Sequence, residues 1–120
     1  QYNLPIKIFI LNNEYMGMVR QWQELLHEKN YSESYTAALP NFVKLAEAYG
    51  CVGIQATKPD ELDEKINKMI NTKEPVIFDC RVDPAENCFP MIPSGKPHNQ
   101  MLLGPEDEKE EVSDEGKTLV

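Results

Sequence analysis

Two consecutive asparagines, Asn12 and Asn13, directly follow the apolar stretch at residues 5–11. In open parallel sheets, ligands bind beyond the carboxyl ends of the strands. The amide oxygen of an asparagine is a hard ligand of the kind that Mg²⁺ or Ca²⁺ takes. Gly17 then opens a helical stretch, and the first backbone N–H groups of a helix attract phosphate. These features are compatible with a site for a metal-bound phosphate, but the local pattern alone favours an ordinary asparagine turn.

Other side chains with chemical potential have less support from their spacing. Asp79 and Asp83 lie near the end of an apolar stretch and resemble possible acids, but we assign them to solvent contacts or turn capping. Arg20 and Glu24 are four residues apart on a predicted helix, a spacing typical of an ion pair. The odd number of cysteines, without a CxxC motif, argues against a disulfide framework or a zinc site and indicates buried or incidental thiols: Cys51, Cys80 and Cys88.

Hydrophobic periodicity predicts the elements that position these residues. Their order is strand, helix, helix, strand, helix, strand, at residues 5–11, 17–29, 41–49, 51–56, 57–70 and 75–82. This alternation indicates an α/β fold with a parallel sheet flanked by helices. The nearly continuous apolar character of residues 5–11 is typical of a strand covered on both faces.

Polar and glycine residues mark the predicted helix ends. Asn41 is expected to cap the second helix, Gly50 to end it in a left-handed conformation, and the Thr57 hydroxyl to cap the third. The first helix has one apolar stripe, which we expect to be buried: Met18, Trp22, Leu25 and Leu26.

The chain ends in a long loop and an acidic tail. Residues 83–105 contain five prolines and no periodicity, so a loop is expected there. The net charge is −8, and residues 105–120 hold seven acidic and two basic residues, a balance of −5. We therefore expect a domain portion at 1–104, a disordered tail at 105–120, and no nucleic-acid partner.

No apolar run approaches the ~20 residues of a membrane span. No signal peptide is seen, so a cytoplasmic location is expected.

Four stretches resemble one enzyme family in the same order. LPIKIFILNNEYMGMVRQWQ is similar to the second half of the thiamine-diphosphate motif of the acetohydroxyacid (acetolactate) synthase catalytic subunit, a motif that runs from Gly-Asp-Gly to Asn-Asn. The resemblance continues through NYSES, NFVKLAEAYG and PMIPSG and covers about residues 1–104. It implies the C-terminal part of a thiamine-diphosphate-binding fold.

The resemblance also implies roles for individual residues. The Asn13 side chain and the Tyr15 backbone carbonyl match the Mg²⁺ ligands of the family. The implied cofactor-binding residues are Tyr15, Met16, Gly17 and Met18. The implied residues of the substrate channel are Val19, Trp22 and Ser94.

Part of the family's site has no counterpart in this sequence. The Gly-Asp-Gly half of the motif, with its metal-binding aspartate, and the family's activating glutamate are not in these residues, so we assign no catalytic residue. For Met18 and Trp22, core packing is the alternative, because both lie on the apolar stripe. We expect residues 1–120 alone to be inactive. We also expect an unpaired sheet edge that promotes dimerisation or aggregation.

The reaction implied by the resemblance condenses pyruvate with a second small 2-keto acid, with loss of CO₂, in branched-chain amino acid biosynthesis. The implied cofactors are thiamine diphosphate and Mg²⁺, with FAD bound outside this segment. The implied partners are the remainder of the catalytic subunit, further copies in a homo-oligomer and a regulatory subunit. Two alternatives stay open: another thiamine-diphosphate-dependent carboligase or decarboxylase, and a non-catalytic α/β interaction domain.

Overall fold

A computed structural model describes residues 2–105 of the chain. The chain forms two compact units. Unit 1 comprises Gln1–Tyr15 and Thr36–Ala85, and unit 2 comprises Met16–Tyr35 and Glu86–Val120. The expected acidic tail at 105–120 lies, apart from its first residue, outside the described residues.

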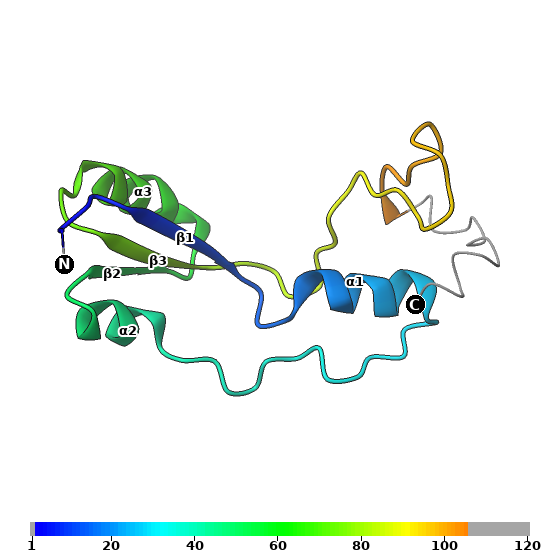
Figure 1. Cartoon of the computed structure of the whole chain (residues 1–120), viewed down its shortest axis with the longest axis horizontal. Coiled ribbons are helices and arrows are strands. Elements are labelled where there is room, and N and C mark those ends of the chain that lie inside the picture. Colours follow the sequence, from blue (N-terminus) through cyan, green and yellow to red (C-terminus); the bar gives the residue numbers. More distant parts are fainter. Residues whose placement is uncertain (1, 106–120) are drawn as a thin grey trace. The chain divides into compact units, whose positions relative to one another are not determined.

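Unit 1 is a three-stranded parallel sheet with helices (Figure 1). The strands lie in the order β1-β3-β2, and both neighbouring pairs are parallel. The elements are β1 (Lys7–Asn12), α2 (Phe42–Ala48), β2 (Val52–Ala56), the short 3-10 helix η1 (Pro59–Glu61), α3 (Leu62–Asn71) and β3 (Val76–Arg81). The predicted α/β class and the predicted order of elements are confirmed.

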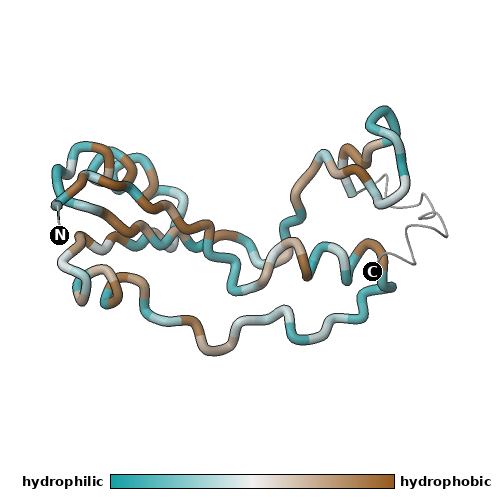
Figure 2. Tube along the Cα trace, in the orientation of Figure 1, coloured by the Kyte–Doolittle hydropathy of each residue, from teal (hydrophilic) through white to brown (hydrophobic). Residues whose placement is uncertain are grey.

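The two α-helices of unit 1, α2 and α3, cover opposite faces of the sheet. Successive side chains of a strand point to opposite faces, and the even-numbered residues of β2 and β3 pack with Met69 of α3. On the other face, α2 approaches so closely that a Cβ on Gly53 would lie 2.8 Å from backbone atoms of Val43. The core on the α3 side consists of Ile54, Ala56, Met69, Val76, Phe78 and Cys80, and the strands carry the hydrophobic colour in Figure 2.

Strand β1 lies at the edge of the sheet, and its outer residues are exposed. Ile8 is 48% exposed, Phe9 40% and Leu11 69%. The expectation that this strand is covered on both faces is therefore wrong for the described residues. The reason is that α2 packs on β2 and β3, and α3 packs on β2, which leaves the apolar residues of β1 without a covering helix.

The helix ends in unit 1 follow the sequence prediction in two of three places. The Asn41 side chain accepts a hydrogen bond from Lys44 N (2.9 Å), and Gly50 has a φ of +71°. The predicted Thr57 hydroxyl cap is wrong. Instead, Thr57 N donates to the Glu61 carboxylate (3.1 Å). Two hydrogen bonds lower the pKa of Glu61: the one from the Lys65 side chain has the larger effect, and the one from Thr57 N has the smaller effect.

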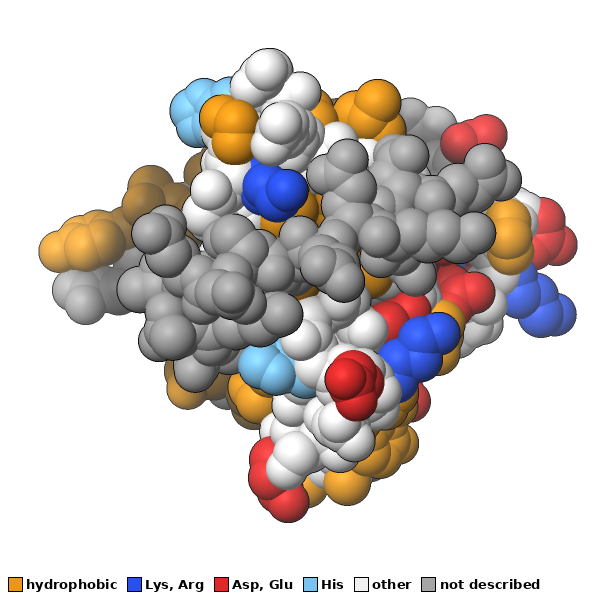
Figure 3. All heavy atoms as spheres, turned by 90° about the vertical axis from the view of Figure 1, so that its right-hand side faces the viewer, with side chains coloured by type: hydrophobic (Ala, Val, Ile, Leu, Met, Phe, Trp, Pro, Cys, Tyr) orange, Lys and Arg blue, Asp and Glu red, His pale blue; other side chains and the backbone are white. Residues whose placement is uncertain are grey.

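Unit 2 contains one helix and a long loop. Helix α1 (Gly17–Leu26) is shorter than predicted, because the chain turns at Glu28 and Lys29, whose φ angles are +52° and +63°. The loop predicted at 83–105 is confirmed, and an isolated antiparallel bridge joins Met91 and Leu102 within it. Within residues 2–105, no helix has the length and apolar character to cross a bilayer. On the face shown in Figure 3, Lys, Arg, Asp and Glu side chains are seen among hydrophobic ones.

Candidate functional site

The turn that follows β1 carries the first candidate ligand. Asn13 is half-buried, and its side-chain oxygen accepts a hydrogen bond from Tyr15 N (3.1 Å). This bond fixes the amide but uses only one lone pair of the oxygen. A small hollow of about 140 Å³ lies beside the turn, lined by Ile10, Leu11, Asn12, Asn13, Glu14, Tyr15, Thr36, Leu39 and Phe42. The structure therefore places Asn13 and Tyr15 together at the carboxyl end of a parallel strand, where ligands bind in such sheets.

The two adjacent asparagines have different environments. Asn12 is 5% exposed, and its side chain is hydrogen-bonded at both ends. Its nitrogen donates to Asp79 Oδ1 (2.7 Å), and its oxygen accepts from Glu14 N (3.1 Å). The Asn12 amide is thus bonded at both its nitrogen and its oxygen, whereas the Asn13 side-chain oxygen accepts from Tyr15 N within the turn itself.

Glu14 has a structural part in the same turn. It adopts a φ of +64°, and its carboxylate pairs with Arg81. Its backbone carbonyl accepts hydrogen bonds from Thr36 N (2.9 Å) and Thr36 Oγ1 (2.6 Å). A carbonyl oxygen has two lone pairs, and these two bonds use both of them. The Glu14 carbonyl is therefore not a candidate metal ligand.

The two aspartates near the end of β3 have different outcomes. Asp83 caps a turn as expected, because its carboxylate accepts from Ala85 N (2.7 Å). Assigning Asp79 to solvent contact or turn capping is wrong, since Asp79 is 1% exposed and accepts from both Asn12 and Gln55 Nε2 (2.7 Å). Burial, together with the neighbouring Asp79 carboxylate, raises the pKa of the adjacent Cys80 thiol, which stays protonated.

Helix α1 begins directly after this turn. Met16 is its N-cap residue and makes no side-chain capping bond; its N–H donates to Ser34 O (2.8 Å). The first turn of the helix contains no acidic side chain, so nothing there repels an anion. The predicted cofactor and channel residues near the start of this helix are exposed: Met16, Gly17, Met18 and Val19.

The buried residue of α1 is polar, which differs from the predicted apolar stripe. Trp22 is half-buried and Met18 is 54% exposed, whereas Gln21 is only 2% exposed. Gln21 Nε2 donates to Cys88 O (2.9 Å), and Gln21 Oε1 accepts from Cys88 N (2.7 Å). The two bonds attach the helix to the loop that carries Ser94, a half-buried residue of the same unit. The sequence did carry a signal for this buried residue, because Gln21 lies three residues after Met18, within the apolar stripe.

Replacing Gln21 with leucine in the complete subunit should release this loop. Loss of a buried hydrogen-bond partner destabilises by about 1–3 kcal/mol, so we expect the Cys88 amide hydrogen to exchange roughly 10 to 100 times faster. Mass-spectrometric hydrogen exchange measures this directly. The matched control is Gln23→Leu, because Gln23 lies on the same helix but bonds to Ser32 O (2.7 Å). Equal exchange at Cys88 in both variants would contradict the assignment.

Charged and aromatic residues hold the chain segment that returns from α1. Arg20 and Glu24 form the predicted pair (2.8 Å), but at 12% and 16% side-chain exposure it is more buried than a surface pair. The Tyr31 hydroxyl donates to Glu24 (3.0 Å), and the Arg20 guanidinium lies 5.2 Å from the centre of the Tyr31 ring.

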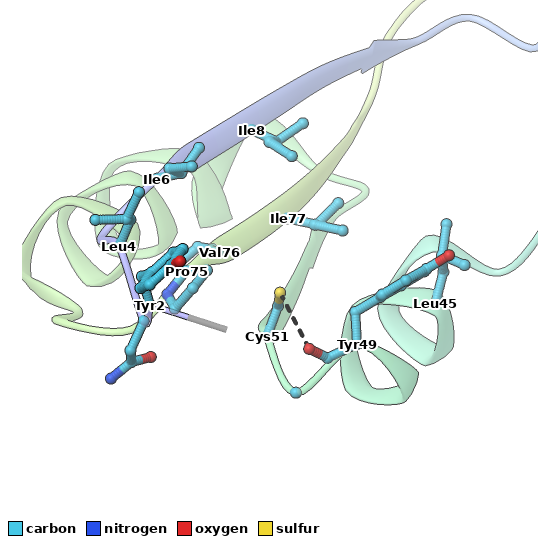
Figure 4. Close-up of a pocket in the computed structure, with 12 residues that line it drawn as sticks. Tyr2, Leu4, Ile6, Ile8, Leu45, Tyr49, Cys51, Pro75, Val76 and Ile77 are labelled. Atoms are coloured by element: carbon cyan, nitrogen blue, oxygen red, sulfur yellow. Dashed lines mark hydrogen bonds between the residues drawn. The ribbon is translucent and has the colours of Figure 1, made fainter.

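A larger hollow lies at the opposite end of the sheet. Its volume is about 710 Å³, and it adjoins the N-terminal ends of β2 and β3, the residues that precede β1, and Ile8 of β1 (Figure 4). Figure 4 shows Leu4, Ile6 and Ile8 along one side and Tyr49 on the other. Ligands of parallel sheets bind at the carboxyl ends of strands, so we assign this hollow to the uncovered sheet edge and not to the candidate site.

The donor set at the Asn13 turn fits a hard cation in part. The described residues contain no group of three or more His, Cys, Asp or Glu side chains that could hold a metal ion. Ligation within these residues would therefore depend on amide and carbonyl oxygens, which suit Mg²⁺. Asn13 can supply one such oxygen from its side chain.

Comparisons with known proteins show the family to which the chain belongs. Residues 1–80 match the family described as thiamine pyrophosphate enzyme, C-terminal TPP binding domain. An acetolactate synthase large subunit from Cyanidium caldarium is 48% identical over 85% of this chain and 18% of its own length. The isozyme 3 large subunit from Escherichia coli is 42% identical over 86% of this chain and 18% of its own length.

A solved structure shares the fold. The thiamine diphosphate-dependent 4-hydroxybenzoylformate decarboxylase of Rhodococcus jostii RHA1 matches with a TM-score of 0.61 and 25% identity, covering 69% of this chain and 16% of that one. The sheet, the turn after its edge strand and these matches define a cofactor-binding domain of the thiamine-dependent class. The chain belongs to the thiamine pyrophosphate enzyme family, as a C-terminal TPP-binding domain. It spans about a fifth of the curated relatives.

Proposed function

We propose that this chain is the C-terminal catalytic segment of an acetolactate synthase. Within the complete subunit, pyruvate and a second 2-keto acid would be joined with loss of one CO₂. The observation that carries the proposal is the Asn13 turn at the carboxyl end of β1, directly followed by the start of α1. The 42–48% identity to acetolactate synthase large subunits supports the choice within the class.

Residues of this chain would hold and orient the cofactor. Thiamine diphosphate, when bound, supplies an electron sink for decarboxylation of the 2-keto acid. The Asn13 amide oxygen and the Tyr15 carbonyl would hold Mg²⁺, which binds the diphosphate. Backbone groups of Met16 and Gly17 would contact the diphosphate, and Met18 would lie beside the cofactor. Tyr15 and its neighbours are thereby assigned to binding, and no residue here is assigned to proton transfer.

The remaining parts of the proposal concern the rest of the enzyme. We infer that residues 1–104 form one part of a domain, completed by the remainder of the catalytic subunit. Further copies, a regulatory subunit, a cytoplasmic location and FAD outside this segment belong to the same proposal. The aspartate of the Gly-Asp-Gly motif would complete the metal site.

A second candidate reaction is supported by the structural match. The Rhodococcus protein is a decarboxylase, and a decarboxylase releases an aldehyde where a synthase forms a new carbon–carbon bond. Supplying the complete subunit with pyruvate, thiamine diphosphate, Mg²⁺ and FAD separates the two reactions. We expect acetolactate, detected as acetoin after acid treatment, together with CO₂. Acetaldehyde as the main product would refute the synthase assignment, and no turnover of any 2-keto acid would favour a non-catalytic domain.

Trp22, Val19 and Ser94 are proposed to line the channel for the second keto acid. We expect Trp22→Leu to change the ratio of acetohydroxybutyrate to acetolactate, formed from mixed 2-oxobutyrate and pyruvate, by about 10-fold, since a changed apolar contact discriminates by ~1–3 kcal/mol. Leu26→Ala on the same helix is the control and should keep the ratio. If Trp22→Leu lowers stability without altering the ratio, Trp22 serves core packing only.

A further inference from the structure

The buried Asp79 carboxylate is connected to the Asn13 turn through the side chain of Asn12. Asp79 Oδ1 accepts from Asn12 Nδ2 (2.7 Å), and Asn12 Oδ1 accepts from Glu14 N (3.1 Å). Asn12 and Asp79 are 5% and 1% exposed. Glu14 adopts its left-handed φ of +64° at the point where this chain of bonds ends.

We propose that Asn12 and Asp79 are positioning residues, which hold the turn at residues 12–15 so that the Asn13 amide is presented to a divalent cation. The inference rests on the proposed function, because it assumes that Asn13 binds Mg²⁺. The chain of hydrogen bonds links β3, through Asp79, to the backbone N–H directly after Asn13. Neither Asn12 nor Asp79 touches the cation in this arrangement.

The orientation of the Asn12 amide is what makes the pair specific. A buried amide flanked by a carboxylate and a backbone N–H has one favourable orientation, since its nitrogen must donate and its oxygen must accept. Asp79 fixes the nitrogen end, and the oxygen then faces Glu14 N. Without the carboxylate, Asn12 can rotate, and the N–H that follows Asn13 loses its buried acceptor.

The second oxygen of Asp79 provides an internal control. Asp79 Oδ2 accepts from Gln55 Nε2 (2.7 Å), and Arg81 Nε lies 3.6 Å from the same oxygen. Gln55 is exposed and bonds to a different Asp79 oxygen from the one that holds Asn12, so its contact supports the carboxylate without directly orienting Asn12. Removing Gln55 therefore takes one hydrogen bond from Asp79 Oδ2 and leaves the bond from Asn12 to Oδ1 in place.

The experiment measures Mg²⁺-dependent binding of thiamine diphosphate to the complete apo-subunit by calorimetry. Loss of groups that orient a metal ligand typically weakens metal affinity by about 10- to 100-fold, so we expect Asp79→Ala and Asn12→Ala each to raise the half-saturating Mg²⁺ concentration by that factor. Asp79→Asn should keep most of the affinity, because its amide oxygen still accepts from Asn12 while the exposed Gln55 amide turns over to accept from its nitrogen. Gln55→Ala should leave the Mg²⁺ requirement unchanged.

The double variant Asn12→Ala/Asp79→Ala tests whether the two residues act as one unit. If they do, its Mg²⁺ requirement matches that of the single variants, since effects within one network are not additive. If Asp79→Ala does not yield a folded subunit, Asn12→Ala and Asp79→Asn carry the test. A lower unfolding temperature of the apo-subunit with an unchanged Mg²⁺ requirement would overturn the proposal, because it would show a purely structural role.

Asn13→Ala, measured in parallel, separates this inference from the proposed function. If Asn13→Ala raises the Mg²⁺ requirement but neither Asn12→Ala nor Asp79→Ala does so, the positioning role alone is wrong. If Asn13→Ala has no effect, the metal site itself is wrong and the inference falls with it.

Discussion

In the complete subunit, Asn13→Ala is expected to raise the Mg²⁺ concentration needed for half-saturation with thiamine diphosphate by at least about 100-fold. Mg²⁺ demands near-octahedral oxygen coordination and gives up water reluctantly, so the loss of a fixed protein oxygen is not easily replaced. Asn13→Asp should retain much of the affinity, because a carboxylate oxygen at the same position is also a hard ligand. Titration of the apo-subunit with Mg²⁺ at constant cofactor checks both results.

Asn41→Ala is the matched control for this prediction. The Asn41 oxygen accepts a backbone N–H, as the Asn13 oxygen does, but at the N-terminus of α2. Its removal should lower stability by about 1 kcal/mol, the typical cost of a lost cap, with no change in the Mg²⁺ requirement. If the two variants behave alike, the effect of Asn13 comes from its turn and not from a metal.

Residues 1–120 prepared without the rest of the subunit are expected to show no synthase turnover and to associate with themselves. The proposed metal site has one side-chain ligand here, and the activating glutamate that the resemblance implies would be supplied by another part of the enzyme. The outer residues of β1 are apolar and exposed, and an unpaired strand edge with such residues is a template for association. Light scattering after size-exclusion chromatography, together with a synthase assay, measures both properties.

Lysine substitutions at the exposed edge test the origin of the association. The double variant Ile8→Lys/Leu11→Lys should shift the population toward monomer, because charge on an edge strand opposes pairing. Ile70→Lys is the matched control: Ile70 is 62% exposed, between the exposures of Ile8 and Leu11, but lies on α3 away from the edge. A monomeric unaltered chain, or an equal shift in both variants, would contradict the assignment to β1.

The periodic residues were sufficient to predict most of the fold. The stretch at 75–82 predicted β3 because apolar and β-branched residues dominate it, and Asn41 and Gly50 correctly marked the ends of α2. The end of α1 could not be predicted, because Glu28 and Lys29 adopt left-handed conformations that neither residue type favours. The exposure of β1 was also missed, since an apolar strand has the same sequence pattern whether or not a neighbour covers it.

The candidate site was predictable only in part. The Asn pair at the end of a strand indicated a metal-bound phosphate only together with the family resemblance. The different environments of Asn12 and Asn13 depend on Asp79, which is 67 residues away in sequence. The Gln21 bonds to Cys88 span the same separation. Such long-range contacts leave no local periodicity, and a buried polar residue has the same sequence pattern as an exposed one.

The hydrogen bonds from Thr36 to Glu14 O have a consequence for the length of the chain between these two residues. They join two points of the backbone that are 22 residues apart, so residues 15–35 form a closed loop. Enlarging such a loop adds little entropy cost, about 0.6 kcal/mol for each doubling. Insertions and deletions should therefore accumulate at residues 27–33, after α1 has ended. The four residues from Asn12 to Tyr15, where each position has a fixed backbone partner, should keep a constant length.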